Sequence, residues 1–242
     1  MKTASIIIIG NEILSGRTQD TNSNYLAKIL VEKGISLEEV RVIPDDHSII
    51  ERVVNNESTA KDYVFTSGGI GPTHDDITAE AIANCFDTSL VIRDDAVELL
   101  AMNYKNGKKD LNAARLRMAR IPEGARLIKN KISGAPGFII KNVFVMAGVP
   151  QIFKAMVQEI ILDIRSVAPI LSKTVKIFKK ESEISERLWD YADKYKDISI
   201  GSYPFNSSGV FGVEIVLRHS DRILLNKVFN EILREFNEPN TS

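Results

Sequence analysis

Residues 66–76 read TSGGIGPTHDD, and the fold of the chain can be worked out from this segment. A short apolar run (YVF, residues 63–65) precedes it, and residues 77–82 (ITAEAI) follow with helical apolar spacing. The pattern predicts a strand, a glycine-rich turn and the start of a helix. Such a turn is typical of a phosphate site, because glycines let the backbone approach an anion and the free N–H groups of a helix's first turn favour negative charge.

Two carboxylates, Asp75 and Asp76, end the same segment and would repel a bare phosphate. A divalent cation between them and the phosphate would remove this conflict, since Mg²⁺ prefers hard oxygen ligands. The cation expected here is Mg²⁺, with Mn²⁺ or Co²⁺ as alternatives. In the competing interpretation the glycines form a tight turn and the two aspartates cap a helix. The segment is neither a dinucleotide fingerprint, because His74 stands where a third glycine is needed, nor a Walker loop.

The segments before this turn alternate between strand and helix patterns. Residues 5–9 (SIIII) form a β-branched run, as expected of a central parallel strand. Apolar spacing predicts helices around residues 25–30 and 49–54, and strands over 37–43 and 62–66. A βαβαβ order implies an α/β fold, with a mostly parallel sheet that carries helices on both faces.

The rest of the chain divides into two parts. Residues 97–104 and 111–118 are predicted to be helical, residues 138–140 and 143–146 a hairpin, and residues 150–164 a helix. A break follows at residues 167–169 (VAP). Beyond it we expect a strand over 173–179, a helix over 182–194, strands near 198–203 and 210–217, and a helix over 221–236. The sequence thus predicts a large domain, residues 1–169, and a small α+β domain, residues 170–242.

Three polar loops follow the three predicted strands: residues 10–12 (GNE), 44–46 (PDD) and 67–76. Parallel α/β sheets bind ligands at the carboxyl ends of their strands, so these loops are expected to form one pocket. Asp45 and Asp46 could supply metal oxygens or cap the next helix, and one of them could do each. His74 could act as a general base or bind phosphate. Zinc is disfavoured, because His47 and His219 form no recognisable ligand set with His74.

Basic residues are concentrated in residues 105–131, which contain nine lysines and arginines against two acidic residues. Most of these side chains are expected to form a solvated surface, but Arg115 and Arg120 are candidates to reach a phosphate, since guanidinium matches its geometry. Asn22 and Asn24 lie near the start of the first helix. One of them could cap it, and the pair could also read the edge of a pterin, flavin or purine ring.

Composition bounds the protein class. The chain has 242 residues, 44% hydrophobic and 26% charged, as in globular proteins. A formal net charge of −1 gives no global attraction to nucleic acid or an anionic membrane, and no apolar stretch approaches membrane-spanning length. The single cysteine, Cys85, favours a reducing compartment. We therefore expect a soluble, cytoplasmic protein without nucleic-acid or membrane partners.

Several motifs, in order along the chain, together resemble a known family. They are GNEIL (residues 10–14), TQDTN (18–22), VIPDD (42–46), SGGIGPTHDD (67–76), APGF (135–138), GVP (148–150) and GSYP (201–204). The set resembles the molybdopterin-binding-like (MoaB/Mog) domain of competence/damage-inducible protein A, and looks closest to the corresponding domain of eukaryotic FAD synthases. The resemblance covers nearly the whole chain. It implies a three-layer α/β/α fold followed by a small α+β domain.

The resemblance also implies an activity. Relatives are associated with metal-dependent hydrolysis of the diphosphate of FAD or ADP-ribose, with release of AMP, and Asp45 and Asp76 match acidic positions near metal and phosphate. Alternatives are a non-catalytic pterin or nucleotide binder and molybdopterin adenylylation. A homo-oligomer, dimer or trimer, is expected. The proposed catalytic residues are Asp45, Asp76, Glu12 and His74, the metal ligands Asp45, Asp75 and Asp76, and the ligand-binding residues Ser67, Gly68, Gly69, Gly71, Thr73, Asn22, Asn24 and Arg115.

Overall fold

The computed structural model describes residues 2–162, 164, 169–207 and 209–237. The chain divides into two compact units, Met1–Val167 and Ala168–Ser242. The division falls two residues before the boundary expected from the sequence, and it lies outside the described residues. Each unit has its own hydrophobic core.

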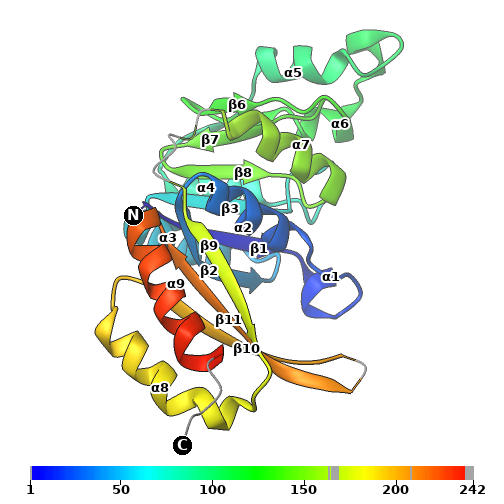
Figure 1. Cartoon of the computed structure of the whole chain (residues 1–242). Coiled ribbons are helices and arrows are strands. Elements are labelled where there is room, and N and C mark those ends of the chain that lie inside the picture. The colour runs from blue at the N-terminus through cyan, green and yellow to red at the C-terminus, as the bar shows by residue number, and fades with distance from the viewer. Residues whose placement is uncertain (1, 163, 165–168, 208, 238–242) are drawn as a thin grey trace, which may run out of the picture. The chain divides into compact units, whose positions relative to one another are not determined.

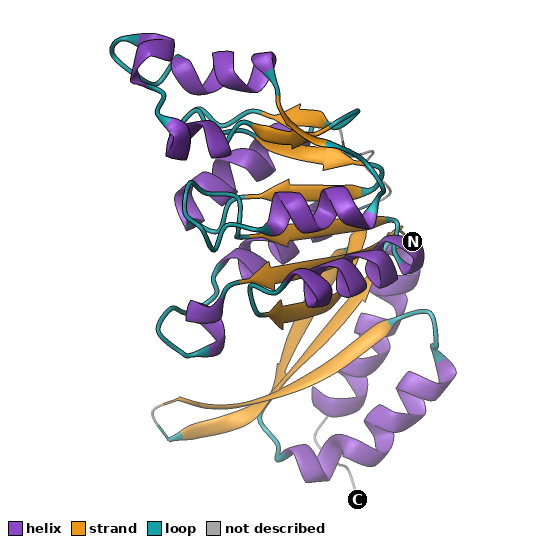
Figure 2. Ribbon diagram, turned by 180° about the vertical axis from the view of Figure 1, so that it is seen from behind, coloured by secondary structure: helices purple, strands orange, loops and turns teal. Residues whose placement is uncertain are grey.

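A six-stranded sheet forms the centre of the first unit, with the strand order β2-β1-β3-β8-β7-β6 (Figures 1 and 2). Strands β2, β1, β3 and β8 are parallel, whereas β7 and β6 are antiparallel to their neighbours. The sheet is therefore mostly parallel, as the βαβαβ pattern predicts. The strands are β1 (Lys2–Ile9), β2 (Ile35–Ile43), β3 (Tyr63–Ser67), β6 (Arg126–Ile128), β7 (Gly137–Ile140) and β8 (Val143–Met146).

Helices cover both faces of this sheet, which gives three layers (Figure 2). Ile6 and Ile8 of β1 pack in one cluster with α2 (Asn22–Glu32) and α7 (Pro150–Ile160). Ile7 and Ile9 pack in the other cluster with α3 (His47–Ala60) and α4 (Thr78–Cys85). Successive side chains of a strand point to opposite faces, so a continuous apolar strand requires a helix layer on each side. The predicted fold class is confirmed.

The segment between α4 and β7 differs from the expectation. The apolar spacing predicts a helix over residues 111–118, whereas the structure has a helix of only five residues there, preceded by a short 3₁₀ turn that ends at Asp110. Strands β4, β5 and β6 are not predicted from the sequence, because each has three residues, too few to show an alternation. The shorter elements of the first unit are α1 (Asn11–Leu14), β4 (Leu90–Ile92), α5 (Asp94–Ala101), η1 (Gly107–Asp110), α6 (Ala113–Arg117) and β5 (Arg120–Pro122).

Over its described residues, the second unit is a three-stranded antiparallel sheet, of order β10-β11-β9, with two helices. Alternate residues of β11, Val213, Ile215 and Leu217, are buried against helix residues. This matches the small α+β unit expected from the sequence. Its elements are β9 (Leu171–Ile177), α8 (Glu181–Lys194), β10 (Ser199–Ser207), β11 (Val210–His219) and α9 (Arg222–Asn237). No helix in the described part of the chain is both long and apolar enough to cross a membrane.

Candidate functional site

The loops that follow β1, β2, β3 and β8 line a single cavity of about 470 Å³ at the carboxyl ends of these parallel strands. The cavity contains the glycine turn and four carboxylates from three of the loops. The polar-loop convergence expected from the sequence is therefore present. The lining residues that bear on ligand binding are Glu12, Asp45, Gly68, Gly69, Gly71, Asp75 and Asp76.

Close backbone packing explains why glycines begin the turn. Gly68 has φ of 115°, and a Cβ atom there would lie 2.1 Å from the carbonyl oxygen of Ile9. Gly69 has φ of 68°, and its Cβ would lie 2.0 Å from the Thr78 hydroxyl. A side chain at either position would clash, and a positive φ would strain it further. The turn therefore needs these glycines whether or not a ligand is present.

The backbone donors of the turn fall into two groups. The N–H of Gly68 donates to the carbonyl of Met146 at 3.0 Å and is thus used within the fold. Within the described residues, the N–H groups of Gly69, Ile70 and Gly71 have no acceptor. Free N–H groups in a glycine turn before a helix can bind an anion. These three groups are candidate donors to a phosphate.

Thr73 organises the two carboxylates of the turn. Its N–H and hydroxyl donate to Asp76 Oδ2 at 2.8 and 2.6 Å, and the hydroxyl also contacts Asp75 Oδ1. The hydrogen bond from Thr73 lowers the pKa of Asp75. Asp75 therefore stays ionised at neutral pH, and Thr73 acts on the site by orienting carboxylates.

The two aspartates after β2 have different partners. Asp45 faces the cavity, and its Oδ2 accepts from the N–H of Asn11 at 2.9 Å, which ties the β1 and β2 loops together. Partial burial, followed by the nearby Glu12 and Asp75 charges, raises the pKa of Asp45. Asp46 instead caps α3 by accepting from the N–H of Ile49 at 3.0 Å. One aspartate thus caps the helix and the other faces the cavity, as considered from the sequence, and a metal role for Asp45 stays a prediction.

The donor set of this cavity fits a cation that takes part of its shell from elsewhere. Among the described residues no group of three or more His, Cys, Asp or Glu side chains is close enough to hold a metal. The charge of Asp75 contributes to the raised pKa of Asp45, after partial burial and the charge of Glu12. Mg²⁺ is commonly bound by one or two carboxylates, with water and substrate phosphate completing the shell. Binding of Mg²⁺ together with a phosphate, with Asp45, Asp75 and Asp76 as candidate ligands, therefore stays a prediction.

Asn22 has a structural position beside the cavity. It is 4% exposed, and its Nδ2 donates to Ser67 Oγ at 2.9 Å and to the Gly148 carbonyl at 2.8 Å. Its Nδ2 therefore joins the β3 and β8 ends, whereas its buried Oδ1 has no hydrogen-bond partner among the described residues. Asn24, two residues further along α2, is exposed and lines none of the site.

Two other candidate side chains lie away from the cavity. His74 is 99% exposed and does not line it, although the carboxylate of Asp75 is 4.0 Å from His74 Nδ1. Arg115 stacks on Tyr104, with its guanidinium carbon 4.3 Å from the ring centre, and donates to the Asp110 carbonyl. Neither His74 nor Arg115 therefore lines the cavity.

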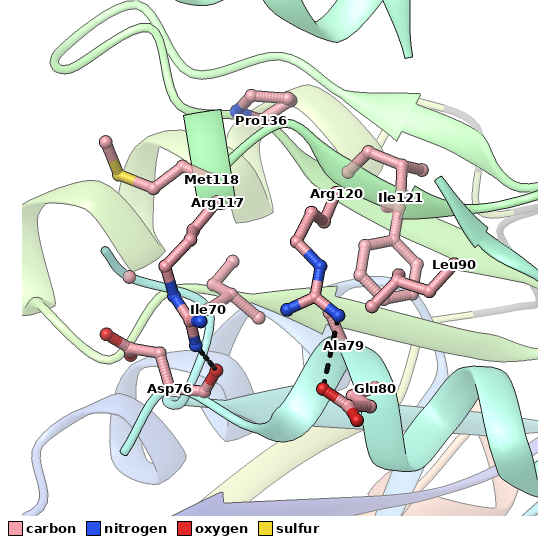
Figure 3. Close-up of a pocket in the computed structure, with 12 residues that line it drawn as sticks. Ile70, Asp76, Ala79, Glu80, Leu90, Arg117, Met118, Arg120, Ile121 and Pro136 are labelled. Atoms are coloured by element: carbon pink, nitrogen blue, oxygen red, sulfur yellow. Dashed lines mark hydrogen bonds and ion pairs between the residues drawn. The ribbon is translucent and has the colours of Figure 1, made fainter. Parts of the chain in front are cut away.

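A different arginine lies beside the glycine turn (Figure 3). Arg117 and Arg120 line a small cavity that shares several residues with the main one, and Arg117 Nη2 donates to the backbone carbonyl of Asp76 at 3.4 Å. Arg120 is paired with Glu80 at 3.2 Å. The charge pattern of the sequence identifies the basic segment but does not select Arg117. The shared lining residues are Ile70, Gly71, Asp76 and Met118.

The far wall of the main cavity is also not predicted from the sequence. It includes Asn130 and Ser133, on the loop between β6 and β7. Asn130 is buried, and its side chain bonds the Ala135 carbonyl at 3.1 Å and the Ile132 N–H at 2.9 Å, which holds the loop in shape. A lone Asn before a Ser-Gly pair is a signal of a turn, and nothing local connects it to a pocket.

A glycine turn and carboxylates at the carboxyl edge of a three-layer, mostly parallel sheet define an α/β ligand-binding protein. Residues 5–171 match the family described as "Probable molybdopterin binding domain", and the chain belongs to this family. Residues 169–241 match a second family, "FAD synthase, middle domain". The resemblance inferred from the motifs is thereby confirmed.

Similar proteins agree with this assignment. The chain is 38% identical to a protein of Archaeoglobus fulgidus over 82% of this chain and 84% of that one. It is 32% identical to "Probable FAD synthase" of Caenorhabditis elegans over 89% of this chain and 46% of that protein, so it spans less than half of that relative's length. The crystal structure of CinA from Thermoplasma acidophilum, described as of unknown function, has a TM-score of 0.62 and 36% identity, and the match covers 67% of this chain and 97% of that one.

Proposed function

We propose that this protein is a metal-dependent nucleotide pyrophosphatase that cleaves the diphosphate of FAD or an ADP-ribose-like substrate and releases AMP. The observation that carries the proposal is that acidic residues of three loops line the same cavity as the glycine-turn residues whose N–H groups have no acceptor among the described residues. A site for a phosphate alone would not be surrounded by carboxylates, whereas a site for a phosphate with a divalent cation would be. The likeness to FAD synthases supports a flavin dinucleotide as one substrate.

Different residues of the cavity would have different roles in the reaction. The N–H groups of Gly69, Ile70 and Gly71 would hold phosphate oxygens, and they would stabilise the charge that develops there. Asp45 and Asp76 would orient the cation, which when bound supplies Lewis-acid polarisation of a phosphoryl oxygen. Glu12 lines the cavity and would accept the proton of the attacking water. The water oxygen then bonds to phosphorus as the bridging P–O bond breaks, and the other phosphate leaves with the bridging oxygen, so that AMP and a second phosphate monoester are formed. Glu12 suits this role better than His74, which points to solvent.

Measuring AMP release would test this proposal. Purified protein is incubated with FAD, ADP-ribose or ATP and with Mg²⁺, Mn²⁺ or Co²⁺, and the products are separated by chromatography. We expect AMP from FAD or ADP-ribose in the presence of at least one cation and none after addition of EDTA. If no substrate yields AMP with any of the three cations, the hydrolase proposal is wrong.

A second candidate is a non-catalytic binder of a pterin or nucleotide. The absence of a three-residue metal group among the described residues favours it over a hydrolase with a preformed metal centre. Tight binding of FAD or ADP-ribose without turnover would support this candidate. Molybdopterin adenylylation is the remaining alternative, and pyrophosphate release from ATP that depends on molybdopterin would identify it.

A further inference from the structure

Two neighbouring arginines beside the glycine turn differ in their charge partners (Figure 3). Arg120 forms an ion pair with Glu80 at 3.2 Å. No carboxylate of the described residues lies within 4 Å of the Arg117 guanidinium, and its one acceptor is the Asp76 carbonyl, 3.4 Å from Nη2. The Nε atom of Arg117 is buried and has no hydrogen-bond partner in the described residues. Arg117 is thus, within this part of the chain, a partly buried cation without an anion.

Such a group is incompletely satisfied by the protein itself. Burying a charged donor without an acceptor costs free energy, so partly buried guanidinium groups are normally paired with an anion. A hydrogen bond of 3.4 Å to a neutral carbonyl is long and replaces an ion pair poorly. The Arg117 site therefore favours an anion that the described residues do not supply.

The position of Arg117 indicates which anion this is. The small cavity that it lines shares Ile70, Gly71 and Asp76 with the main cavity, and the guanidinium contacts the Asp76 carbonyl, so it lies beside the turn that carries the free N–H groups. A phosphate held by these N–H groups is the nearest anionic group that a ligand would bring. Arginine presents parallel N–H groups that match two oxygens of one phosphate.

We propose that Arg117 binds a phosphate group of the ligand and selects for ligands with a diphosphate. One phosphate would occupy the N–H groups of Gly69 to Gly71, and the adjoining phosphate would take Arg117 away from the Asp76 carbonyl. This inference rests on the phosphate-binding part of the proposed function and not on hydrolysis. Arg117 supplies a fixed positive charge beside a cavity whose lining residues Glu12, Asp45 and Asp75 are acidic.

The experiment measures binding by isothermal titration calorimetry in Mg²⁺, with pyrophosphate, ADP-ribose, AMP and adenosine as probes. A charged hydrogen bond contributes about 1.5–3 kcal/mol, so Arg117→Ala should weaken pyrophosphate and ADP-ribose binding roughly 10- to 100-fold. Binding of AMP, which has one phosphate, should be weakened less, and any binding of adenosine should not change. Arg117→Lys keeps the positive charge without the parallel N–H groups of the guanidinium, and it should give an intermediate loss of affinity. Arg120→Ala is the matched control, because Glu80 already neutralises Arg120, and it should change binding less than about twofold.

Unchanged pyrophosphate binding in Arg117→Ala would overturn the inference, and so would a wild-type protein that binds neither pyrophosphate nor ADP-ribose. An equal loss in Arg120→Ala would show a general charge effect and would also overturn it. Thermal unfolding of each variant checks the fold, and Arg117→Lys decides the question if Arg117→Ala does not fold. Arg117-dependent binding without AMP release would refute the hydrolase proposal and leave this inference standing. AMP release with an unchanged KM in Arg117→Ala would support the hydrolase proposal and refute the role of Arg117.

Discussion

Asp45 and Asp46 are adjacent in the chain, and their side chains have unrelated roles. Asp45 faces the cavity and bonds the N–H of Asn11, whereas Asp46 caps α3. The difference arises because β2 ends just before this pair and α3 begins just after it. One side chain points into the strand-end pocket and the other toward the helix N–H groups.

Substitution of this pair should separate binding from stability. We expect Asp46→Ala to lower the urea midpoint of unfolding, because the α3 cap is lost, and to leave the dissociation constant for Mg²⁺ with pyrophosphate unchanged. Asp45→Asn should weaken that binding and leave the midpoint nearly unchanged, since the amide oxygen can still accept from Asn11. Equal effects of the two substitutions on binding would contradict the assignment.

Asp76→Asn should separate catalysis from folding in the same way. The amide oxygen of Asn can still accept from the N–H of Thr73, so the turn should keep its shape and the thermal midpoint should hardly move. AMP release should fall by roughly 10²–10³-fold, the range for losing one preorganised charge-stabilising group. A large fall in the thermal midpoint would instead indicate that Asp76 mainly supports the fold.

At the scale of elements, the turn between β3 and α4 is held by close backbone contacts as much as by hydrogen bonds. Gly68 approaches Ile9 of β1, and Gly148 lies close to Gly68, so three strand ends pack without intervening side chains. This packing brings the loops near enough to share one cavity.

Alanine substitutions at Gly16 and Gly68 should therefore lower the free energy of unfolding by different amounts. Gly16 has φ of 72°, and a Cβ atom there would have no neighbour within 4 Å, so Gly16→Ala should lower the free energy of unfolding by about 1–2 kcal/mol, from the backbone alone. Gly68→Ala adds a clash with Ile9, so it should lower the free energy of unfolding by more than Gly16→Ala does. It should also weaken phosphate binding. Urea unfolding of both variants measures this. Equal costs would mean that the turn can relax around a side chain.

The pairing of β1 with β3 should depend on pH through Asp62. Hydrogen bonds from Lys2 and from the N–H of Thr3 lower the pKa of Asp62 below its usual value of 3.8. A carboxyl group with a lowered pKa stabilises the fold above its unfolded pKa, and this contribution disappears as pH falls through the folded pKa. Wild type should therefore be more stable than Asp62→Asn at pH 7, and the difference should shrink as pH falls below 3.8 and through the lowered folded pKa. A difference that is constant with pH would contradict this.

At the scale of the whole molecule, the two units have separate hydrophobic clusters. The clusters of the first unit contain no residue of the second, and the cluster of the second lies wholly between Leu171 and Phe236. The candidate site belongs to the first unit alone. A homo-oligomer and a cytoplasmic location stay predictions from the sequence.

Because each unit has its own hydrophobic core, a core substitution in one unit should destabilise that unit alone. Ile215 is fully buried in the second unit, and Ile215→Ala should lower that unit's stability by about 2–5 kcal/mol. In hydrogen exchange followed by mass spectrometry, peptides of β9 to α9 should then exchange faster, while peptides of β1, β3 and α4 should not change. Faster exchange throughout the chain would show that the units unfold together.

Much of the fold follows from local patterns. The βαβαβ order, the hairpin at residues 138–146 and the second unit are predicted, because apolar period and turn residues act over a few positions. Strands β4 to β6 are missed because three residues carry no period. The convergence of the β1, β2 and β3 loops is predicted as well, since all parallel strands end at the same edge of a sheet.

Residue type and short-range spacing were enough to establish the layered α/β architecture, the glycine turn and the acidic loops at one sheet edge. Which side chains face the cavity could be learned only from the folded chain. It places Arg117 rather than Arg115 beside the turn, leaves His74 in solvent and uses the Gly68 N–H within the sheet. Burial, ion pairing and close contacts between backbone segments depend on residues far apart in the chain, so no local sequence pattern predicts them.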